Sequence, residues 1–508
     1  MIHHFVPSVI QKIGGYAILA AQRKNINRFY QSTLYASETQ RLVLNSILSA
    51  SKGRKIEALF EKYGIHDADS FLKNLPLQTY DSLEPFLTDR DDLSIDLKNP
   101  TVSYIATSGT TGKPKIIPIT KKCIQSALNG WKIWGWHYFR EFPKLLNVPM
   151  LKISQPEALN LKMNDRTITT MTNIIADIQP WYVKRRYLPK RSPNSTHNDF
   201  ERASYFDLCW REYIEESIPL PPIIMAANPA SIAQWLQSKP HESVPMPTNI
   251  VTWRGGTMGH FAKRIESLIP KVSICDPGLI ASEGRFTLGL GDPRGAGVLD
   301  IQAFYFEFLP LNKEISHEYL LPCHQLVTNE TYEIVVTSYA GLSRYRMHDL
   351  VRCDGFLGTT PKLTFLQKRS EFCSLVGEKL SAKQVSDAID LTEQKFGVSF
   401  DHAQLIPHQR DDLARLFYVL IVSPSICLEH QQKISIERYF DQMLCQGNME
   451  YERKRNTGRL TSIEIVEVKR EFFEEPLLRM HLQFKPEVLV SNLCKAEEIL
   501  KKHFHRSF

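Results

Sequence analysis

Long apolar runs, paired cysteines and an excess of charge of one sign are all missing from this sequence of 508 residues. Lys12 and the Gly14-Gly15 pair interrupt the apolar patch within residues 1–22, so we expect neither a membrane span nor a signal peptide there. The nine cysteines form no C-x-x-C pair and have no histidine spacing suited to zinc. Reduced thiols in a cytoplasmic protein are the expected state.

The charge is nearly balanced, which argues against nucleic acid as a partner. The chain has 62 basic and 55 acidic side chains, a net charge of +7 that is spread along its length. The densest basic run, residues 184–191, lies in a stretch rich in proline, asparagine and serine. We predict a solvated loop there, with a phosphate or partner contact as the alternative.

Length and composition indicate a globular protein of at least two domains. The chain exceeds the roughly 250–300 residues at which a single hydrophobic core stops growing. Its hydrophobic fraction of 43% and charged fraction of 23% are ordinary for a globular protein. We find no internal repeat and no low-complexity tract.

Hydrophobic periodicity predicts a change from helices to strands near residue 100. Apolar residues recur at three- and four-residue spacing in Thr39–Phe60 and in Ser70–Phe86, which predicts helices. The segment Thr101–Thr120 predicts a strand, a loop rich in glycine and threonine, and a second strand. Such a loop can present backbone N–H groups to a ligand.

The middle of the chain predicts parallel α/β units followed by a β-rich half. Short apolar runs at 223–226, 250–253 and 272–275 alternate with helix-like stretches, as parallel strands joined by helices do. The runs 303–308 and 332–337 predict strands with no helix between them. The expected fold class is therefore α/β with mixed α+β elements.

A shift to polar and charged residues predicts a boundary between a large domain, residues 1–368, and a small α+β domain, residues 369–508. The small domain is expected to contain an amphipathic helix from Ala382 to Phe396. Strand patterns follow at 416–422 and 462–468. These elements are enough for an independent core.

The strongest chemical motif is a nine-residue string with two glycines, four hydroxyl side chains and two lysines. It consists of Thr107, Ser108, Gly109, Thr110, Thr111, Gly112, Lys113, Pro114 and Lys115. Glycine lets the backbone approach an anion closely, while hydroxyls and lysines supply donors and charge. The glycine spacing differs from that of the G-x-x-x-x-G-K-[ST] loop. We therefore predict a phosphate loop of another kind, with a plain surface turn as the alternative.

This string resembles the phosphate loop of the superfamily of adenylate-forming enzymes. A more specific resemblance, to the auxin-responsive acyl-acid amido synthetases, rests on residues 303–310 and 332–346 and extends to residues 71–80 and 377–381. That family joins small carboxylic acids, such as plant hormones, to amino acids. The resemblance covers roughly residues 40–490. It implies a large N-terminal adenylating domain and a smaller, mobile C-terminal domain.

The resemblance also implies a site for Mg²⁺ beside the nucleotide. Ser282 and Glu283 match a motif whose glutamate is associated with Mg²⁺, and a hard oxygen ligand suits that ion. The alternative is a helix cap or a surface carboxylate. Leu279 departs from the family pattern, because an aromatic residue that stacks on adenine usually stands there.

Asp349 resembles the aspartate that accepts hydrogen bonds from both ribose hydroxyls, with an ordinary loop aspartate as the alternative. His348 replaces the glycine that usually precedes this aspartate, so its side chain must point away from the ribose or reshape the turn. Gly255 and Gly256 correspond to a glycine-rich turn near the nucleotide and the acyl group. They suit an ordinary strand-to-helix turn equally well.

Cations near the domain boundary and the C-terminus complete the implied site. Lys368 and Arg369 lie at the hinge, where either side chain could reach ribose or phosphate; Gln367 replaces the usual glycine there. A solvated basic turn is the alternative. Lys485 most resembles the late lysine that bridges the acyl carboxylate and the α-phosphate in the closed form. Lys485 and Lys115 are the predicted catalytic cations.

An aromatic helix is expected after the phosphate loop. Residues 126–139 contain three tryptophans, His137 and Tyr138. In the resembled family, helices at this place line the acyl pocket, but a helix this aromatic is usually part of a core. We expect a core helix, and His137 alone is no evidence for a catalytic base.

The predicted reaction uses ATP and Mg²⁺ to convert a small carboxylic acid into an acyl-adenylate, which then reacts with an amine, by implication an amino acid. The predicted enzyme is thus an acyl-acid amido synthetase that forms a C–N bond and releases AMP and pyrophosphate. Two alternatives remain: a ligase with a thiol acceptor, either CoA or a carrier protein, and a nucleotide-binding protein without catalysis that has a regulatory or interaction role. We expect a cytoplasmic monomer with no nucleic-acid partner and no membrane span.

Overall fold

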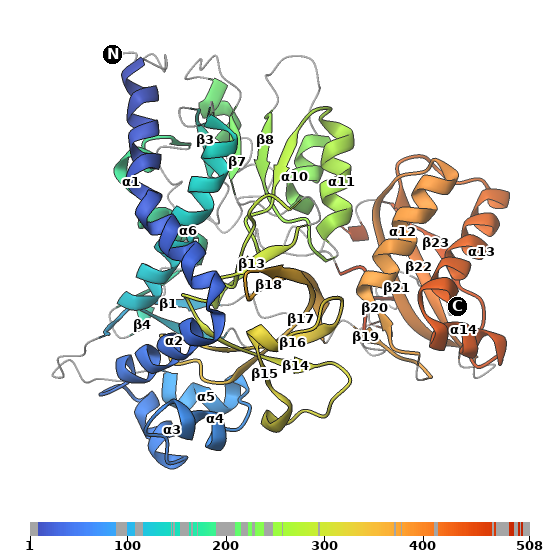
Figure 1. Ribbon diagram of the computed structural model, residues 1–508. Coiled ribbons are helices and arrows are strands. Elements are labelled where there is room, and N and C mark those ends of the chain that lie inside the picture. The colour runs from blue at the N-terminus through green and yellow to red at the C-terminus, as the bar shows by residue number, and fades with distance from the viewer. Residues whose placement is uncertain are drawn as a thin grey trace. The chain divides into compact units, whose positions relative to one another are not determined.

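The computed structural model describes most of the chain (Figure 1). The described residues are 9–87, 99–106, 115–143, 145, 148–152, 162–163, 166–169, 171–188, 209–214, 222–225, 229–237, 247–256, 258–292, 295–369, 372–376, 378–410, 415–469, 472–473, 487–491, 496–497 and 499–500. The chain divides into two compact units, one within residues 1–255 and 264–365 and the other within residues 256–263 and 366–508. The functional domains 1–368 and 369–508 stay predictions. No described helix is both long and apolar enough to cross a membrane.

Five helices open the first unit. They are α1 (Val9–Leu34), α2 (Ala36–Ala50), α3 (Ile56–Lys62), α4 (Ala68–Asn74) and α5 (Tyr80–Leu87). The predicted helical stretches are confirmed, but each is divided in two. Gly53 adopts a left-handed φ of +77° in the turn between α2 and α3. Pro76 keeps Leu75 extended, which ends α4, because the residue before a proline is disfavoured in a helix.

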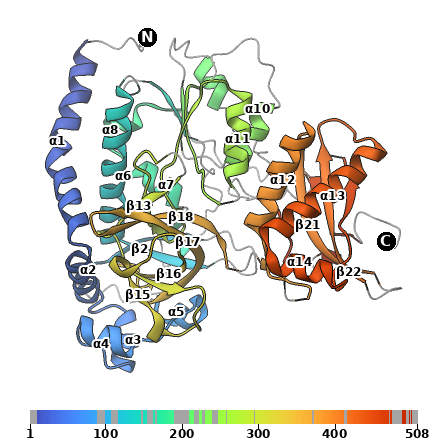
Figure 2. The ribbon, with the colours of Figure 1, turned by 45° about the vertical axis from the view of Figure 1, so that its right-hand side comes forward.

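A small sheet and a long helix follow. The sheet has the order β2-β1-β5-β4 and contains β1 (Thr101–Ala106), β2 (Ile116–Thr120), β4 (Lys162–Met163) and β5 (Arg166–Thr169). The long helix is α6 (Lys121–Glu141), and α7 (Met171–Asp177) packs against it. Thr120 caps α6 by accepting a hydrogen bond from the Cys123 N–H at 3.3 Å. Figures 1 and 2 show α1 and α6 side by side.

A five-stranded parallel sheet confirms the predicted α/β units. Its order is β6-β3-β7-β8-β9, and every neighbouring pair is parallel. The strands are β3 (Met150–Lys152), β6 (Tyr187–Leu188), β7 (Ile223–Met225), β8 (Asn249–Val251) and β9 (Ser273–Cys275). The helices along this part of the chain are α8 (Trp181–Lys184), α10 (Pro229–Gln237) and α11 (Met258–Leu268).

The basic run at residues 184–191 differs from the predicted solvated loop. Arg186 is buried, with 4% of its surface exposed. Its guanidinium donates to the carbonyl oxygen of Val148 at 2.9 Å and to that of Leu145. Carbonyl groups from a distant segment therefore satisfy this arginine, which local composition could not reveal. Residues 189–191 lie outside the described part of the chain.

A seven-stranded antiparallel sheet forms the β-rich half. Its order is β12-β13-β18-β17-β16-β14-β15. The strands are β12 (Thr287–Leu288), β13 (Gly297–Leu299), β14 (Tyr305–Pro310), β15 (Leu321–Pro322), β16 (Thr331–Thr337), β17 (Tyr345–Leu357) and β18 (Thr360–Lys368). A hairpin of β10 (Ile280–Ala281) and β11 (Gly284–Arg285) precedes it, and the 3-10 helices η2 (His317–Tyr319) and η3 (Cys323–Gln325) flank β15. The strands predicted at 303–308 and 332–337 are confirmed as β14 and β16.

The second unit has its own core. Its elements are β19 (Phe372–Cys373), β20 (Leu380–Ser381), α12 (Ala382–Phe396), β21 (Phe400–Arg410), β22 (Arg415–Pro424), α13 (His430–Gly447), α14 (Met449–Asn456) and β23 (Glu464–Glu467). Alternate residues of β22 enter two clusters: Tyr418 and Leu420 pack with α12 and α13, while Phe417 and Val419 pack with the C-terminal residues Val490, Ala496 and Leu500. The central strand is therefore buried on both faces. The predicted helix α12 and strands β22 and β23 are confirmed, whereas β21 was not predicted.

Candidate functional site

The predicted phosphate loop falls outside the described residues, but both strands that flank it are described. Residues 107–114 connect Ala106, the last residue of β1, to Lys115, which precedes β2. Ala106 pairs with Ile116, so the two ends of the loop lie on adjacent strands. The following therefore stay predicted phosphate ligands: Thr107, Ser108, Gly109, Thr110, Thr111 and Gly112. Lys485 also lies outside the described part.

Tyr80, the first residue of α5, holds the chain where the loop enters β2. Its hydroxyl donates to the Ile116 carbonyl oxygen at 3.0 Å and accepts from the Ile116 N–H at 2.8 Å. Burial raises the pKa of Tyr80, so the hydroxyl stays protonated and can serve both bonds. These two bonds hold the backbone of Ile116, the residue that follows Lys115.

Tyr345 is hydrogen-bonded to two of the predicted site residues. Lys115 Nζ donates to the Tyr345 hydroxyl at 3.1 Å and lies 5.7 Å from the centre of the Tyr345 ring. The hydroxyl is also hydrogen-bonded to Glu283. Burial raises the pKa of Tyr345 above its usual range, and the charges of Glu283 and Asp349 raise it further. The hydroxyl therefore accepts from the lysine and donates to the carboxylate.

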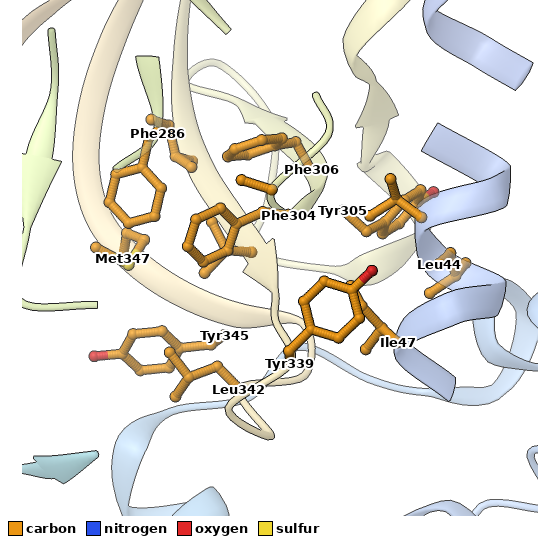
Figure 3. Close-up of a cluster of buried hydrophobic side chains, with 14 of the residues drawn as sticks. Leu44, Ile47, Phe286, Phe304, Tyr305, Phe306, Tyr339, Leu342, Tyr345 and Met347 are labelled. Atoms are coloured by element: carbon orange, nitrogen blue, oxygen red, sulfur yellow. The ribbon is translucent and has the colours of Figure 1, made fainter. Parts of the chain in front are cut away.

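The aromatic core determines where this hydroxyl lies. The Tyr345 residue is 2% exposed, and its ring belongs to the same buried cluster as Phe286, Phe304 and Phe306. Figure 3 shows the Tyr345 hydroxyl pointing away from these three rings. The apolar part of the side chain is thus fixed by packing, while its polar tip is left for the site.

Glu283 lies at the tip of the hairpin between β10 and β11, where Ser282 and Glu283 form the turn. The residue that follows the turn must be glycine. A β-carbon at Gly284 would lie 2.5 Å from the Phe304 ring, and its φ of +148° is one that side chains rarely adopt. Glycine therefore lets the hairpin approach the aromatic core closely, which places Glu283 beside Tyr345.

Asp349 lies in an irregular stretch of β17 and is 3% exposed. The register between β16 and β17 shifts at Glu333 and Val335, opposite this stretch. His348 adopts a left-handed φ of +57°, a conformation that suits the glycine usually found before this aspartate. Its Nδ1 lies 3.4 Å from Glu333 Oε1. The departure from the family pattern is thus accommodated by turning the histidine toward Glu333.

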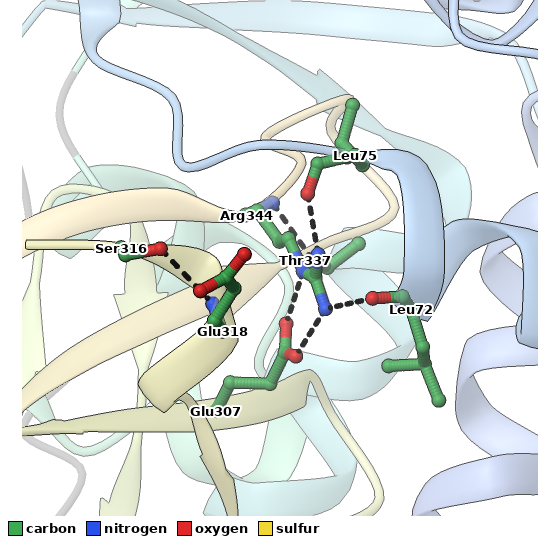
Figure 4. Close-up of polar contacts among 7 residues, drawn as sticks. All are labelled: Leu72, Leu75, Glu307, Ser316, Glu318, Thr337 and Arg344. Atoms are coloured by element: carbon green, nitrogen blue, oxygen red, sulfur yellow. Dashed lines mark hydrogen bonds and ion pairs between the residues drawn. The ribbon is translucent and has the colours of Figure 1, made fainter.

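Arg344, the residue before β17, anchors the strand that carries Tyr345. Its guanidinium donates to both carboxylate oxygens of Glu307, at 2.8 and 3.0 Å, to the Leu72 carbonyl oxygen at 2.9 Å and to the Leu75 carbonyl oxygen. Figure 4 shows these bonds converging on one side chain. The end of α4, β14 and the start of β17 are therefore joined at a single buried arginine.

Four further predicted site residues lie near two positions where the chain passes from one unit to the other. Gly255 packs closely on β18, since a β-carbon there would lie 3.3 Å from the Phe365 carbonyl oxygen. Gly256 adopts a left-handed φ of +59° and belongs to the second unit. Lys368 ends β18, and Arg369 follows it in the same unit. Gly255 therefore has a packing role, and the roles of all four residues at the nucleotide stay predictions.

The aromatic helix α6 is part of a core, as expected. Trp134 and Tyr138 are buried and stack with ring centres 4.9 Å apart, in a cluster shared with α1 and β7. His137 Nε2 lies 3.1 Å from the Tyr30 hydroxyl, and burial lowers the pKa of His137 to about 4. The imidazole is therefore neutral at physiological pH and occupied within the helix packing.

Tyr80 and Tyr345 belong to none of the chemical motifs in the sequence. Both stand in stretches that carry the family resemblance, residues 71–80 and 332–346. Periodicity places both on buried faces, where an aromatic residue is normally assigned to the core. A buried tyrosine still needs a partner for its hydroxyl. That requirement is the signal that could have identified them.

Comparison with known proteins points to one family. Residues 25–212 match the GH3 family N-terminal domain and residues 297–368 match the GH3 family central domain, together just over half of the chain. The chain is 23% identical over 431 residues to the jasmonoyl-L-amino acid synthetase JAR4 of Nicotiana attenuata. That similarity covers 72% of this chain and 75% of the tobacco protein.

Solved structures share the fold. The chain is similar to the acyl acid amido synthetase AtGH3.15 in complex with 2,4-DB, with a TM-score of 0.72, 17% identity and coverage of 95% of this chain and 96% of that one. A 2-hydroxyisobutyryl-CoA ligase in the postadenylation state gives a TM-score of 0.56 at 12% identity, covering 95% and 92%. Both show a mixed α/β fold common to adenylating enzymes. The two family matches establish that this chain belongs to the GH3 family.

Proposed function

We propose that this protein uses ATP to activate a carboxylic acid as an acyl-adenylate and transfers the acyl group to the amine of an amino acid. One observation carries the proposal: Lys115, Tyr345 and Glu283 are in contact beside the predicted phosphate loop, in a chain of the GH3 family. The names of its relatives, an amino acid synthetase and an acyl acid amido synthetase, support an amine acceptor over a thiol.

The chemistry explains the need for ATP. A carboxylate and an amine do not condense at neutral pH, because the carboxylate is anionic and hydroxide is a poor leaving group. In the first step a carboxylate oxygen attacks the α-phosphorus and pyrophosphate leaves. In the second step the amine nitrogen attacks the acyl carbonyl, AMP leaves with the electron pair of the C–O bond, and the nitrogen loses a proton.

In the first step the described residues of the site have separate roles. Lys115, held by the Tyr345 hydroxyl at 3.1 Å, places a positive charge beside the predicted phosphate loop. Tyr345 orients the Glu283 carboxylate through its hydroxyl proton. Asp349 is 3% exposed, and a carboxylate can accept from both ribose hydroxyls at once.

Mg²⁺ fits this arrangement through Glu283. The described residues contain no group of three or more His, Cys, Asp or Glu side chains that could hold a metal ion alone. Mg²⁺ is usually bound by one or two carboxylates together with substrate phosphates and water. Glu283, oriented by Tyr345, would supply that carboxylate, and the ion would neutralise charge on the phosphates.

Cations at the domain boundary and in the smaller C-terminal domain, residues 369–508, complete the proposed mechanism. We assign Lys368 and Arg369 to the hinge of this mobile domain, where either side chain could reach ribose or phosphate. Lys485 bridges the acyl carboxylate and the α-phosphate when the domain closes. Gly255 and Gly256 form the turn near the nucleotide. These assignments rest on the family's site pattern.

Acid-dependent pyrophosphate exchange tests the proposed function. A library of aryl, indolyl and alkyl acids is supplied with ATP, Mg²⁺ and labelled pyrophosphate, and the best acid is then offered the common amino acids, simple amines and CoA. The proposal expects exchange with one class of acid and an amide product with an amino acid. A thioester product with CoA would favour the thiol ligase. ATP binding without exchange for any acid would favour a protein without catalysis.

Tyr345→Phe is expected to reduce acid-dependent exchange about 10- to 100-fold, a loss of about 1.4–2.7 kcal/mol of transition-state stabilisation, because it removes the hydroxyl that is hydrogen-bonded to two charged groups. Exchange kinetics and the melting temperature are measured together. The matched control is Tyr332→Phe, which removes a buried hydroxyl that accepts from the Val327 N–H at 2.9 Å in the same sheet. Equal activity in both variants would exclude Tyr345 from the site.

A further inference from the structure

Glu333, on β16, holds two residues of β17 at once. Its side chain is 0% exposed and accepts from Arg346 Nε and Nη2 at 2.9 and 3.0 Å. The oxygen that accepts from Nε, Oε1, also lies 3.4 Å from His348 Nδ1. Arg346 and His348 are two residues apart in β17. A single buried carboxylate therefore contacts the residues before and after Met347.

This contact spans the place where β17 carries extra residues. Val335 pairs with Arg346 and Glu333 pairs with Leu350, so a step of two residues on β16 faces a step of four on β17. The extra residues cannot follow the ladder and must bulge. His348 lies within this bulge and has a left-handed φ of +57°.

Side-chain alternation separates the two faces of the bulge. Met347 and Asp349 are buried, at 4% and 3% exposure, while the His348 side chain is 40% exposed on the side of Glu333. A left-handed φ is unfavourable for a residue with a β-carbon, although histidine adopts it more often than most residues do. The contact with Glu333 offsets this strain and fixes the backbone just before Asp349.

We infer that Glu333 and His348 form a clamp that positions Asp349, with His348 acting as a positioning residue that does not itself touch the nucleotide. The inference rests on the proposed function, in which Asp349 binds the ribose hydroxyls. A glycine at position 348 would adopt the same φ without strain but would leave the bulge free to relax. Asp349 would then be correctly oriented in only a fraction of the molecules. The affinity for the ribose would fall in proportion to that fraction.

His348→Gly is therefore expected to raise the Kd for ATP on the order of tenfold, with kcat for pyrophosphate exchange changed less than about twofold. The increase shrinks for 2′-deoxy-ATP, because one of the two ribose bonds is already missing. Asparagine tolerates the left-handed region and carries a donor for Glu333, so His348→Asn restores most of the affinity. Binding is measured by titration calorimetry of the full chain, and KM and kcat by exchange kinetics.

Two further variants make the test specific. Asn329→Gly relieves another left-handed residue, with φ of +71°, outside the site and leaves ATP affinity unchanged. Glu333→Gln keeps the size of the side chain and gives an intermediate loss. The clamp is overturned if His348→Gly binds ATP like the unmodified protein, if ATP and 2′-deoxy-ATP lose affinity equally, or if His348→Asn restores nothing.

Asp349→Ala distinguishes failure of the clamp from failure of the proposed site. If Asp349→Ala weakens ATP binding and His348→Gly does not, the ribose contact stands and the clamp is wrong. If Asp349→Ala binds ATP as tightly as the unmodified protein, the ribose contact is wrong and the clamp falls with it. Loss of affinity in both variants, with rescue by asparagine at position 348, supports both.

Discussion

Replacing Lys485 with alanine is expected to slow turnover from acid and ATP about 10²–10³-fold, in line with the loss of one preorganised charge at a reacting centre. Two anions, the acyl carboxylate and the α-phosphate, must be brought together in the first step. A cation delivered by domain closure stabilises them only when both are present. Turnover from chemically prepared acyl-adenylate is expected to change much less, because the anions have already reacted.

A second lysine of the same unit provides the comparison for Lys485. Lys379 has an exposed side chain and a left-handed φ of +47°, between the buried residues Glu378 and Leu380. Strained residues of this kind concentrate at functional sites. Both alanine variants are assayed with acid plus ATP and with acyl-adenylate. Near-normal turnover of Lys485→Ala alongside a large loss in Lys379→Ala would move the bridging role to Lys379.

Glu307→Ala is expected to lower the free energy of unfolding by about 3–5 kcal/mol, because it leaves a buried arginine without its charged partner. The side chains of Arg344 and Glu307 are 2% and 5% exposed, so water cannot replace the lost carboxylate. Urea denaturation followed by tryptophan fluorescence measures the effect. All seven tryptophans lie within residues 1–255, so the signal reports on the first unit.

Glu318→Ala is the matched control for Glu307→Ala. Glu318 is exposed, and its contact with Ser316 uses its backbone N–H, which the substitution keeps (Figure 4). Its effect on the free energy of unfolding should stay within about 0.5 kcal/mol. A loss below about 1 kcal/mol for Glu307→Ala would show that the Leu72 and Leu75 carbonyl groups satisfy Arg344 without the carboxylate.

Elements with local signals were predictable from the sequence. The helix α12 begins and ends where expected because its signals are its own: Ser381 and Gln384 form a capping box, and Gly397 ends it with a left-handed φ of +63°. Strand β21 was missed because its residues, 400–410, are largely polar. It is stabilised by pairing along its whole length with β22.

Short motifs could name candidate residues for the site, but they could not show which side chains contact one another. Lys115 and Asp349 were selected from short motifs whose chemistry suits phosphate and ribose, and their roles stay predictions. Tyr345 was not selected, although it contacts Lys115 and Glu283. No local pattern shows that a tyrosine hydroxyl will meet a lysine 230 positions earlier in the chain.

By itself the sequence determined the parallel α/β units, the helix α12 and the type of chemistry, because periodicity, capping and the glycine–hydroxyl–lysine string are local features. Only the tertiary structure decided how charge is buried. Arg344 pairs with Glu307, 37 positions away, and the buried Arg186 donates to the Val148 carbonyl oxygen, 38 positions away. Glu333 accepts from Arg346 on the neighbouring strand β17. Such partners are chosen by strand order and packing, since a buried charge is tolerated only where folding brings acceptors to it.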